Sequence, residues 1–348
     1  MRKKTRKVYY GDLPVGGDAP ISVQSMTNTK TINIKETVAQ IEELAENGCE
    51  LIRVAVPDRK TAKILSRIKQ AVTIPLIADI HFDYRLALEA VEQGVDGLRL
   101  NPGNIGKADR VKQVVEKAKS VNIPIRIGVN SGSLEKKLLE KYGQPTAEAM
   151  VESAASHIKI LEKNDFHDIV ISLKATDVMM TIKAYQLFAK KYNYPLHIGI
   201  TEAGTPWSGT IKSAVGIGSL LSRGLGDTIR ISLTGEPLEE VKVGWEILKS
   251  LGLRKRGPEI ISCPTCGRTN IDLVDLVDKV EKAVSHLDNQ ITIAVMGCAV
   301  NGPGEAREAD IGIAGGKGKG LIFKKGQLVK KVEEEELLKE LMKEINKL

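Results

Sequence analysis

Short apolar runs rich in β-branched residues alternate along most of the chain with longer segments in which apolar residues recur every three or four positions. The short runs predict buried β-strands, and the three-to-four spacing predicts amphipathic helices. After residue 20 the alternation repeats eight times over about 230 residues. The eight predicted strands begin at Ile21, Leu51, Pro75, Gly97, Pro124, Asp168, Pro195 and Thr228.

A helical pattern follows these strands, and the clearest examples cover residues 35–47, 59–72, 84–93, 109–121 and 146–163. Eight strand–helix units in a segment of this length predict an α/β fold, the (β/α)8 TIM barrel. The alternative is an open, doubly wound sheet, but no Gly-x-Gly-x-x-Gly turn follows the first strand. We expect residues 1–20 to form a hairpin that covers the floor of the barrel.

The eighth helix is predicted over residues 239–251, and a basic link with glycine and proline follows at 252–258. Such a link is typical of a domain boundary. We therefore assign residues 1–257 to a substrate-binding barrel domain and residues 258–348 to a small α+β domain. In the second domain the pattern predicts a helix over 271–286, strands at 291–296 and from 311, a hairpin around 324–326 and a helix from 333.

Polar residues at the strand ends are the main candidates for a binding site, because TIM barrels carry their sites at the carboxyl ends of the strands. Residues two apart on a strand share a face. If the apolar residues face the helices, the polar ones point into the barrel, where a charge is costly unless it is paired. Five cations would then converge from five strands: Arg53, Arg99, Arg126, Lys174 and Arg230.

A single arginine inside a barrel is often paired with an acid and has only a structural role. The clear acids at this mouth are Asp79 and Glu202, so the predicted cations outnumber them. The surplus predicts a bound polyanion. Guanidinium and ammonium groups, together with glycine-rich loops that expose backbone N–H groups, suit a diphosphate.

Other polar residues near the predicted mouth are candidates for substrate contacts. Glu202 ends the seventh strand, where it either neutralises an arginine or handles a proton in a reaction. His81 follows the third strand and could form a hydrogen bond to substrate, although lone histidines are more often structural. The remaining substrate-binding candidates are Asn101, Asn130, Thr201 and Ser232.

Three of the four cysteines lie in the last quarter of the chain. Cys263 and Cys266 form a Cys-x-x-Cys pair, and a glycine-rich turn between Cys298 and Glu305 follows later. Three thiolates make an incomplete site, because zinc and iron–sulfur clusters usually take four protein ligands. A structural zinc site completed by His286 is one alternative. The N–H groups of the turn and an oxygen ligand from Glu305 favour an iron–sulfur cluster with one labile iron.

Charge and composition limit the possible partners. The chain has 51 basic and 44 acidic residues, a net charge of +7, which fits an anionic substrate or an acidic protein partner. Only 4% of residues are aromatic, so stacking platforms for nucleic acid are scarce, and we expect no nucleic-acid partner. No apolar run is long enough to span a membrane, and the basic start is not followed by an apolar stretch. We therefore expect a cytoplasmic location without membrane contact, where the thiols, including a buried and unreactive Cys49, stay reduced.

Two segments, SCPTCGR at 262–268 and MGCAVNGPGEA at 296–306, resemble the cluster motifs of bacterial 4-hydroxy-3-methylbut-2-enyl diphosphate synthases. Barrel segments such as IRVAVP, LRLNPGN, IRIGVNSGSL and ITEAGT agree, and the resemblance covers essentially the whole chain. It implies the reductive ring opening and dehydroxylation of 2-C-methyl-D-erythritol 2,4-cyclodiphosphate in the methylerythritol phosphate route to isoprenoids. The alternatives are a redox-inert, phosphate-binding barrel enzyme with a structural zinc tail and a nucleic-acid binder with such a tail.

The resemblance also implies roles for individual residues. A [4Fe-4S] cluster would be ligated by Cys263, Cys266, Cys298 and Glu305, and would receive single electrons from flavodoxin or ferredoxin. Both donors are acidic proteins, which suits the positive surplus of this chain. Glu202 would protonate or bind the departing oxygen. The diphosphate would be held by Arg53, Arg99, Arg126, Asn130, Lys174, Arg230 and Ser232.

The course of the chain predicts a homodimer with shared sites. Strand eight ends at the mouth, so the eighth helix returns to the floor, and the second domain leaves from the face opposite the site. The link could span on the order of 25 Å when fully extended, hardly enough to bring a cluster over the mouth of its own barrel. We therefore expect a head-to-tail dimer in which each cluster caps the partner's barrel, and the resemblance implies the same.

Overall fold

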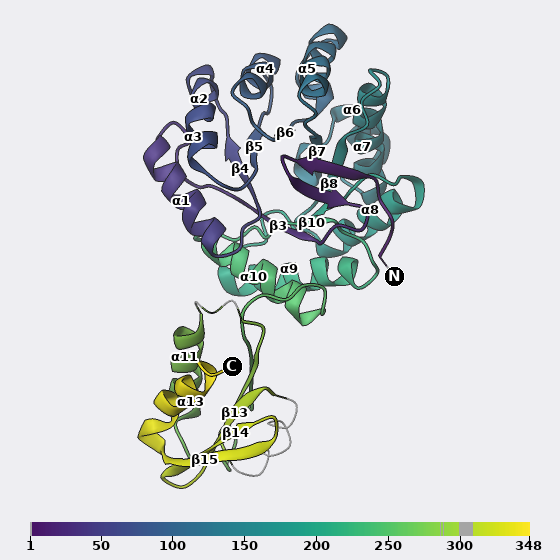
Figure 1. The fold of residues 1–348 in the computed structure, drawn as a ribbon. Helices are drawn as coiled ribbons and strands as arrows, with labels where there is room; N and C mark the ends of the chain where they lie inside the picture. The colour runs from purple at the N-terminus through teal and green to yellow at the C-terminus, as the bar shows by residue number, and fades with distance from the viewer. Residues whose placement is uncertain (1, 286, 288, 299–308) are drawn as a thin grey trace. The chain divides into compact units, whose positions relative to one another are not determined.

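The structure is a computed structural model that describes residues 2–285, 287, 289–298 and 309–348. It divides into two compact units, Met1–Arg254 and Lys255–Leu348, which are described separately (Figure 1). None of the described helices is long and apolar enough to cross a membrane.

The first unit is built around eight parallel strands in the order β8-β7-β6-β5-β4-β3-β10-β9. An isolated parallel bridge between Ile171 and Leu196 joins the two ends of this order, so the ring is nearly closed. Each strand predicted from the sequence is present, and the TIM-barrel fold is confirmed. The strands are β3 (Ser22–Met26), β4 (Leu51–Ala55), β5 (Leu76–Asp79), β6 (Gly97–Arg99), β7 (Ile125–Asn130), β8 (Ile169–Lys174), β9 (His197–Ile198) and β10 (Thr228–Ile229).

Helices surround these strands, with their apolar faces packed against the strands in one continuous core (Figure 1). The helix expected over 59–72 is interrupted at Ile64, and a short helix at 136–142 was not expected. The helices are α1 (Ile34–Glu46), α2 (Arg59–Lys63), α3 (Leu65–Ala71), α4 (Tyr84–Glu92), α5 (Ala108–Ser120), α6 (Lys136–Tyr142), α7 (Ala147–Glu162), α8 (Val178–Lys191), α9 (Pro206–Leu221) and α10 (Pro237–Ser250), with 3-10 turns η1 (Pro102–Asn104) and η2 (Ser131–Ser133).

An N-terminal hairpin, β1 (Lys7–Tyr10) and β2 (Leu13–Gly16), covers the floor of the barrel. Its buried residues Val8, Tyr10 and Val15 pack with Leu51, Ile77 and Val170 in a cluster of their own. The ring of Tyr10 lies so close to Gly97 that a side chain at that position would collide with it. The floor is therefore filled with apolar side chains, and a ligand can enter only from the opposite end.

Arg254, the last residue of this unit, lies at the same floor. Its guanidinium donates to the carbonyl of Ile21, at 2.7 Å, and pairs with Glu50, at 3.0 Å. These two residues directly precede strands β3 and β4, at their amino ends. The chain thus leaves the barrel on the face opposite the carboxyl ends of the strands, as the sequence suggested.

The second unit is a five-stranded sheet in the order β11-β12-β13-β14-β15, with helices α11 and α13 packed together in its apolar core. Strands β11, β12 and β13 are parallel, and the last two pairings are antiparallel. Strand β11 was not expected from the sequence, and the last helix begins at Leu337 rather than at 333. The elements are β11 (Glu259–Ser262), α11 (Leu273–Val284), β12 (Thr292–Met296), β13 (Ile311–Gly315), β14 (Lys319–Lys324), β15 (Gln327–Glu333), the 3-10 turn η3 (Glu334–Glu336) and α13 (Leu337–Ile345).

Candidate active site

The structure brings the five predicted cations together inside the barrel. Each lies on a different strand or directly after it, and their side chains are buried or nearly so. Burial lowers the pKa of Arg53 well below its usual range, and the neighbouring charges of Arg126, Arg230 and Arg99 lower it further against the opposing effect of Asp79. These cations therefore repel one another at short range, as a site built for a polyanion would require.

Several nitrogen atoms of these side chains are buried and have no hydrogen-bond partner within the described part of the chain. They are Nε and one terminal nitrogen of Arg126 and Nε of Arg99 and of Arg230. Burial, together with the charge of Arg99, lowers the pKa of Arg126 to about 10. A buried donor without an acceptor costs about 1–3 kcal/mol, and more when the group is charged, so these donors indicate a site for an anion.

Asp79 is the acid that holds two of the cations. Its carboxylate lies 3.2 Å from Arg99 and 3.7 Å from Arg53, and His81 approaches it to 3.6 Å. Burial alone would raise the pKa of Asp79, but the charge of Arg53, the hydrogen bond from His81 and the charge of Arg99 outweigh it and lower the pKa. Asp79 is therefore ionised and orients the two arginines, while the side chain of His81 remains more than half exposed.

Glu240, on helix α10, is a second buried acid that the sequence analysis missed. It lies 3.4 Å from Arg230 and accepts hydrogen bonds from the backbone N–H of Leu233, at 3.0 Å, and from the hydroxyl of Ser25, at 3.4 Å. It is only 5% exposed, so it links a cation, a mouth loop and the first barrel strand. Its spacing from Gly244 places it on the buried face of α10, and this spacing could have identified it.

Of the two interpretations of Glu202, as a partner of an arginine or as a group that handles a proton, the structure does not support the first. Glu202 is exposed, and among the described residues it forms no ion pair; its carboxylate accepts a hydrogen bond from the hydroxyl of Thr176, at 3.4 Å. Its φ angle is 51°, in the left-handed region that residues other than glycine rarely adopt. A strained backbone at the mouth of a barrel is a feature of functional positions.

The amide of Asn101 is fully engaged with the backbone of strand β7. It donates to the carbonyl of Gly128, at 3.0 Å, and accepts from the N–H of the same residue, at 2.8 Å. Gly128 must lack a side chain, because a Cβ there would lie 2.8 Å from Nε of Arg99. Asn101 thus fixes the mouth of the barrel around Arg99.

The remaining predicted residues also lie at the mouth. Asn130 is the last residue of β7 and pairs with Lys174 at the end of β8. Thr201 follows β9 and donates its backbone N–H to the carbonyl of Ala175, at 3.4 Å, and Ser232 follows β10 and is half-buried. The amine of Lys174 lies 3.2 Å from Nε2 of a further residue that the sequence analysis missed, the fully buried His197.

The cysteines of the second unit lie at the carboxyl ends of two neighbouring parallel strands. Ser262 of β11 pairs with Val295 of β12, so the loops that carry Cys263 and Cys298 start side by side. The backbone N–H of Gly297 donates to Sγ of Cys263 at 3.3 Å. Parallel strands β11 and β12 are thus the structural reason that two motifs far apart in the sequence meet.

The three thiols of this edge differ in environment. Cys263 is half-buried, Cys266 exposed and Cys298 buried. Hydrogen bonds from the backbone and side chain of Arg268 lower the pKa of Cys266 and favour its thiolate, the form that binds metal. Glu305 and His286, the two proposed further ligands, lie outside the described residues. Within the described residues, no three histidine, cysteine or acidic side chains are grouped closely enough to hold a metal ion.

Cys49, in contrast, is a buried thiol of the barrel, and it donates a hydrogen bond to the carbonyl of Leu51, at 3.3 Å. Burial raises the pKa of this thiol to about 12. Cys49 is therefore unreactive, as expected from its position before the second barrel strand.

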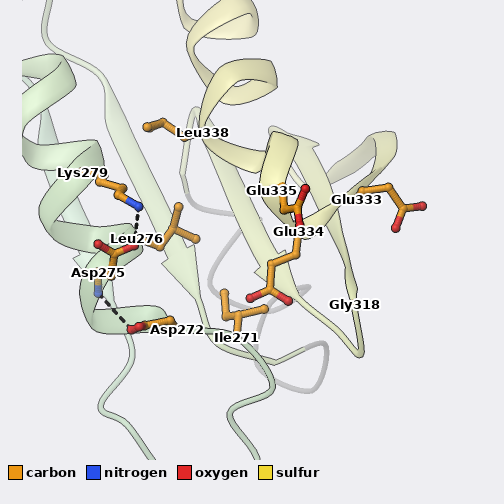
Figure 2. Close-up of a pocket in the computed structure, with 10 residues that line it drawn as sticks. All are labelled: Ile271, Asp272, Asp275, Leu276, Lys279, Gly318, Glu333, Glu334, Glu335 and Leu338. Atoms are coloured by element: carbon orange, nitrogen blue, oxygen red, sulfur yellow. Dashed lines mark hydrogen bonds and ion pairs between the residues drawn. The ribbon is translucent and has the colours of Figure 1, made fainter.

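A groove of about 670 Å³ in the second unit lies between α11 and the segment that precedes α13 (Figure 2). Its floor contains apolar side chains, and its one lysine, Lys279, pairs with Asp275 at 2.6 Å. An acidic groove repels phosphates, so it is not the diphosphate site. The carboxylates that line it belong to Asp272, Asp275, Glu333, Glu334 and Glu335.

Comparison with known proteins agrees with this architecture. Residues 5–245 match the family model of the GcpE TIM-barrel domain, and residues 259–347 match that of the GcpE protein C-terminal domain. The chain is 61% identical to the 4-hydroxy-3-methylbut-2-en-1-yl diphosphate synthase (flavodoxin) of Clostridium perfringens, over 98% of each chain. It is 60% identical to the enzyme of the same name from Caldanaerobacter subterraneus subsp. tengcongensis, over 100% of this chain and 98% of that one.

A solved structure shares the fold at much lower identity. The dihydropteroate synthase of Stenotrophomonas maltophilia is 11% identical to this chain, with a TM-score of 0.52, and the match covers 71% of this chain and 97% of that one. At this identity the likeness concerns the fold alone.

Proposed function

The chain belongs to the GcpE family, and we propose that its barrel binds the cyclic diphosphate substrate while its C-terminal unit carries an iron–sulfur cluster. The enzyme is an oxidoreductase that converts 2-C-methyl-D-erythritol 2,4-cyclodiphosphate into (E)-4-hydroxy-3-methylbut-2-enyl diphosphate in isoprenoid biosynthesis. With the cyclic substrate written as a dianion and the linear product as a trianion, the reaction takes up two electrons and one proton and releases one water. The diphosphate therefore gains a negative charge when the ring opens.

The observation that carries the binding proposal is the excess of buried cations. Four guanidinium groups and the amine of Lys174 face two buried acids, Asp79 and Glu240, and several guanidinium nitrogens have no acceptor among the described residues. Charge-assisted hydrogen bonds to phosphate would satisfy these donors and relieve their mutual repulsion. They would also stabilise the charge that the phosphate gains as its bond to carbon breaks. We assign contacts with the diphosphate to Arg53, Arg99, Arg126, Asn130, Lys174, Arg230 and Ser232.

The other predicted residues complete the substrate site. His81 and Thr201 lie at the rim, where they can reach the carbon skeleton, and Asn101 contributes by holding the strand end beside Arg99. Glu202 is the proton donor in this proposal. It is exposed at the mouth and forms no ion pair with any residue that the structure describes, so we assign to it the transfer of a proton to the hydroxyl that leaves as water.

The cluster would be a [4Fe-4S] centre held by Cys263, Cys266, Cys298 and Glu305. The donor set fits, because two thiol loops meet at one sheet edge and the thiolate form of Cys266 is favoured. The cluster supplies the two electrons one at a time. We assign the cluster domain to residues 258–348 and the substrate domain to residues 1–257.

Flavodoxin is the electron donor that we propose, because the names of the relatives specify it. Flavodoxins and ferredoxins are acidic, and a chain with a net charge of +7 attracts such a partner. We place the enzyme in the cytoplasm, where its thiols remain reduced.

We also propose a homodimer with shared sites. The chain leaves the barrel at its floor through Arg254, while the substrate enters at the mouth, so a second copy can bring its cluster to the site more easily than the same chain can. Helix α9 supports this proposal. Its outer face carries the exposed apolar residues Trp207, Ile211 and Val215, four positions apart, as an interface between copies would.

Mixing two inactive variants tests the shared site. Glu202→Ala removes the proton donor of one barrel, and Cys298→Ser removes a ligand of one cluster. In a mixed dimer one of the two sites would combine an intact barrel with an intact cluster, so activity should recover to as much as about a quarter of the wild-type level. Mixtures that never exceed the sum of the separate variants would contradict shared sites.

Turnover by the full chain tests the function itself. Anaerobically purified protein with reduced flavodoxin and the cyclodiphosphate should form the linear diphosphate. Cys298→Ser should still bind the cyclodiphosphate, because the barrel cations are intact. It should form no product, because the cluster that would supply the electrons loses a ligand. Product formation by this variant at the wild-type rate would overturn the assignment of the cluster.

A further inference from the structure

The barrel contains a pair of buried basic groups in direct contact, Lys174 and His197. Lys174 ends strand β8 and is 6% exposed, and His197 begins strand β9 and is fully buried. The amine nitrogen lies 3.2 Å from Nε2 of the imidazole. The backbone leaves space for the amine beside Gly199, where a Cβ would lie 2.8 Å from it.

The hydrogen-bond partners of this pair leave one nitrogen unsatisfied. Nδ1 of His197 is buried and has no partner within the described residues. If Lys174 is an ammonium, Nε2 must accept from it, and the imidazole proton moves to Nδ1, where nothing accepts it. If Lys174 is a neutral amine, it can accept from the N–H at Nε2 of a neutral imidazole, and Nδ1 is then a buried acceptor without a partner among the described residues. A buried acceptor without a partner costs less free energy than a buried donor without one. In the absence of an anion, the geometry therefore favours the neutral pair.

The positive charges around Lys174 and His197 also favour the neutral form of both side chains. Burial lowers the pKa of Lys174 well below its usual range, and the charges of Arg126, Arg230 and Arg53 lower it further, against Glu240. The pKa of His197 is lowered by burial, by Lys174 and by the same three arginines.

The elements that surround the pair supply one acid close to it. Helix α10 contributes Glu240, which is already committed to Arg230 and to the backbone of Leu233. Helix α8 contributes the hydroxyl of Tyr185, which donates to the backbone carbonyl of His197, at 2.6 Å, and leaves the imidazole free. Strands β4 and β7 and the segment after β10 contribute the positive charges of Arg53, Arg126 and Arg230. An incoming diphosphate is thus the main source of negative charge for the pair.

We propose that Lys174 and His197 form a proton-binding pair that is neutral in the free enzyme and takes up one proton from solvent when the diphosphate binds. The proton adds to the amine of Lys174, and the imidazole proton of His197 moves from Nε2 to Nδ1. The ammonium then donates to Nε2 of His197 and to a phosphate oxygen. His197 is a positioning residue that accepts from the ammonium. The proposal rests on the diphosphate site described above. It deepens that site by giving the enzyme a cation that is charged only when substrate is present.

Calorimetric titration of the full-length, anaerobic protein with the cyclodiphosphate measures the proton directly. The titration is repeated in two buffers of different ionisation enthalpy, at intervals between pH 6 and pH 9. Each phosphorus of the cyclic substrate carries one strongly acidic group, so the ligand itself remains a dianion in this range. The proposal predicts an uptake that reaches between about half a proton and one proton per bound ligand. Uptake below about 0.2 proton at every pH would overturn it.

Variants identify the group that takes up the proton. Lys174→Arg carries a permanent charge, so it should bind the cyclodiphosphate without proton uptake; unchanged uptake in this variant would refute the proposal. His81→Asn and Glu202→Gln each remove one other titratable group at the mouth, and each should retain the wild-type uptake per bound ligand. If either abolishes it, the proton belongs to that residue instead.

His197→Asn tests the partner of Lys174. An asparagine is too short to reach the amine, so the neutral amine loses a donor and the ammonium loses an acceptor. The maximal proton uptake per bound ligand should therefore fall. An unchanged maximum would exclude His197 from the pair. The failure of this inference differs from that of the proposed function: protein that binds the cyclodiphosphate without taking up a proton keeps the function, whereas protein that does not bind it at all loses both.

Discussion

The barrel and the second unit both carry their candidate groups at the carboxyl ends of parallel strands, but they do so in different ways. In the barrel, cations such as Arg53 and Arg126 belong to the strands themselves and point into the interior. In the second unit, Cys263 and Cys298 belong to loops that begin where β11 and β12 end. The first arrangement buries the charged groups inside the barrel, and the second places the thiols on loops at the edge of a sheet.

This difference has a consequence for stability. Buried cations that outnumber their acids destabilise the folded protein until an anion binds. The same side chains therefore increase the affinity for an anion and lower the stability of the ligand-free barrel. Thiols on loops lower the stability of the folded protein little when no metal is bound. Their substitution should therefore leave the second unit folded and abolish only its function. The following variants test this contrast, from the largest expected effect to the smallest.

Cys263→Ser should have the largest effect, because it removes a proposed thiolate ligand. We expect turnover to fall by at least about 100-fold and the iron content of the anaerobic protein to fall with it, while the thermal unfolding of the barrel is unchanged. Cys49→Ser is the matched control. It replaces a buried thiol with a donor of similar size at a cost of about 1 kcal/mol and should retain iron and turnover. Equal loss of iron in both variants would contradict the assignment.

Arg126→Met should weaken binding and stabilise the fold. The loss of a buried, charged donor should reduce affinity for the cyclodiphosphate by about 100-fold in calorimetry. A cation whose pKa falls to about 10 makes folding less favourable below that pH, by an amount on the order of 3 kcal/mol, and the penalty disappears as the pH rises through the range between 10 and the ordinary value of 12.5. The variant should therefore be more stable than wild type at pH 7, by about 1–3 kcal/mol.

The exposed Arg223 provides the control for this experiment, since Arg223→Met should change neither affinity nor the free energy of unfolding by a measurable amount. Destabilisation by Arg126→Met at neutral pH would show that the barrel cations are compensated without a ligand.

Glu240→Gln should moderately reduce both the affinity for the cyclodiphosphate and the stability of the fold. It removes the charge that holds Arg230 and weakens the bond to the Leu233 N–H, so affinity should fall by about tenfold and stability by about 2 kcal/mol. Glu239→Gln, next to it, breaks only an exposed pair with Lys242 and should cost at most about 0.5 kcal/mol. If the two variants behave alike in calorimetry and thermal unfolding, Glu240 is not part of the site.

Glu202→Gly should change the stability of the barrel less than Arg126→Met and Glu240→Gln do. Glycine adopts a φ of 51° without strain, so the variant should gain about 0.5–1 kcal/mol in the free energy of unfolding while turnover falls by about 100-fold. Glu202→Gln keeps the strained backbone and should lose turnover without gaining stability. A variant with glycine that is less stable than wild type would show that the glutamate backbone is not strained.

The sequence predicted most of the barrel, because parallel strands and inward-facing polar residues follow a simple period. Residues such as Arg99 and Arg126 could be assigned to the interior from their alternation with isoleucine and leucine alone. Glu240 and His197 could not be paired with their partners in this way. Glu240 contacts the loop that precedes its own helix and Ser25 of β3, and His197 contacts Lys174 where strands β8 and β9 meet to close the ring; these contacts exist only in the folded chain.

The second unit was predicted less completely for a similar reason. Strand β11 has only four residues and little burial, so its pattern is too short to recognise. Its pairing with β12 nevertheless decides that Cys263 lies beside Gly297. The sequence could therefore predict the thiol ligands from their motifs but not the sheet edge at which the loops of Cys263 and Cys298 start.

The most direct test of the account is the Mössbauer spectrum of full-length protein reconstituted anaerobically with iron-57 and sulfide, recorded with and without the cyclodiphosphate. We predict a four-iron centre in which three irons resemble thiolate-bound sites and one differs, and that addition of the cyclodiphosphate changes the signal of this one iron. A protein that binds no iron, or a spectrum of four equivalent irons that the cyclodiphosphate leaves unchanged, would contradict the claim that the second unit delivers electrons to a diphosphate held in the barrel.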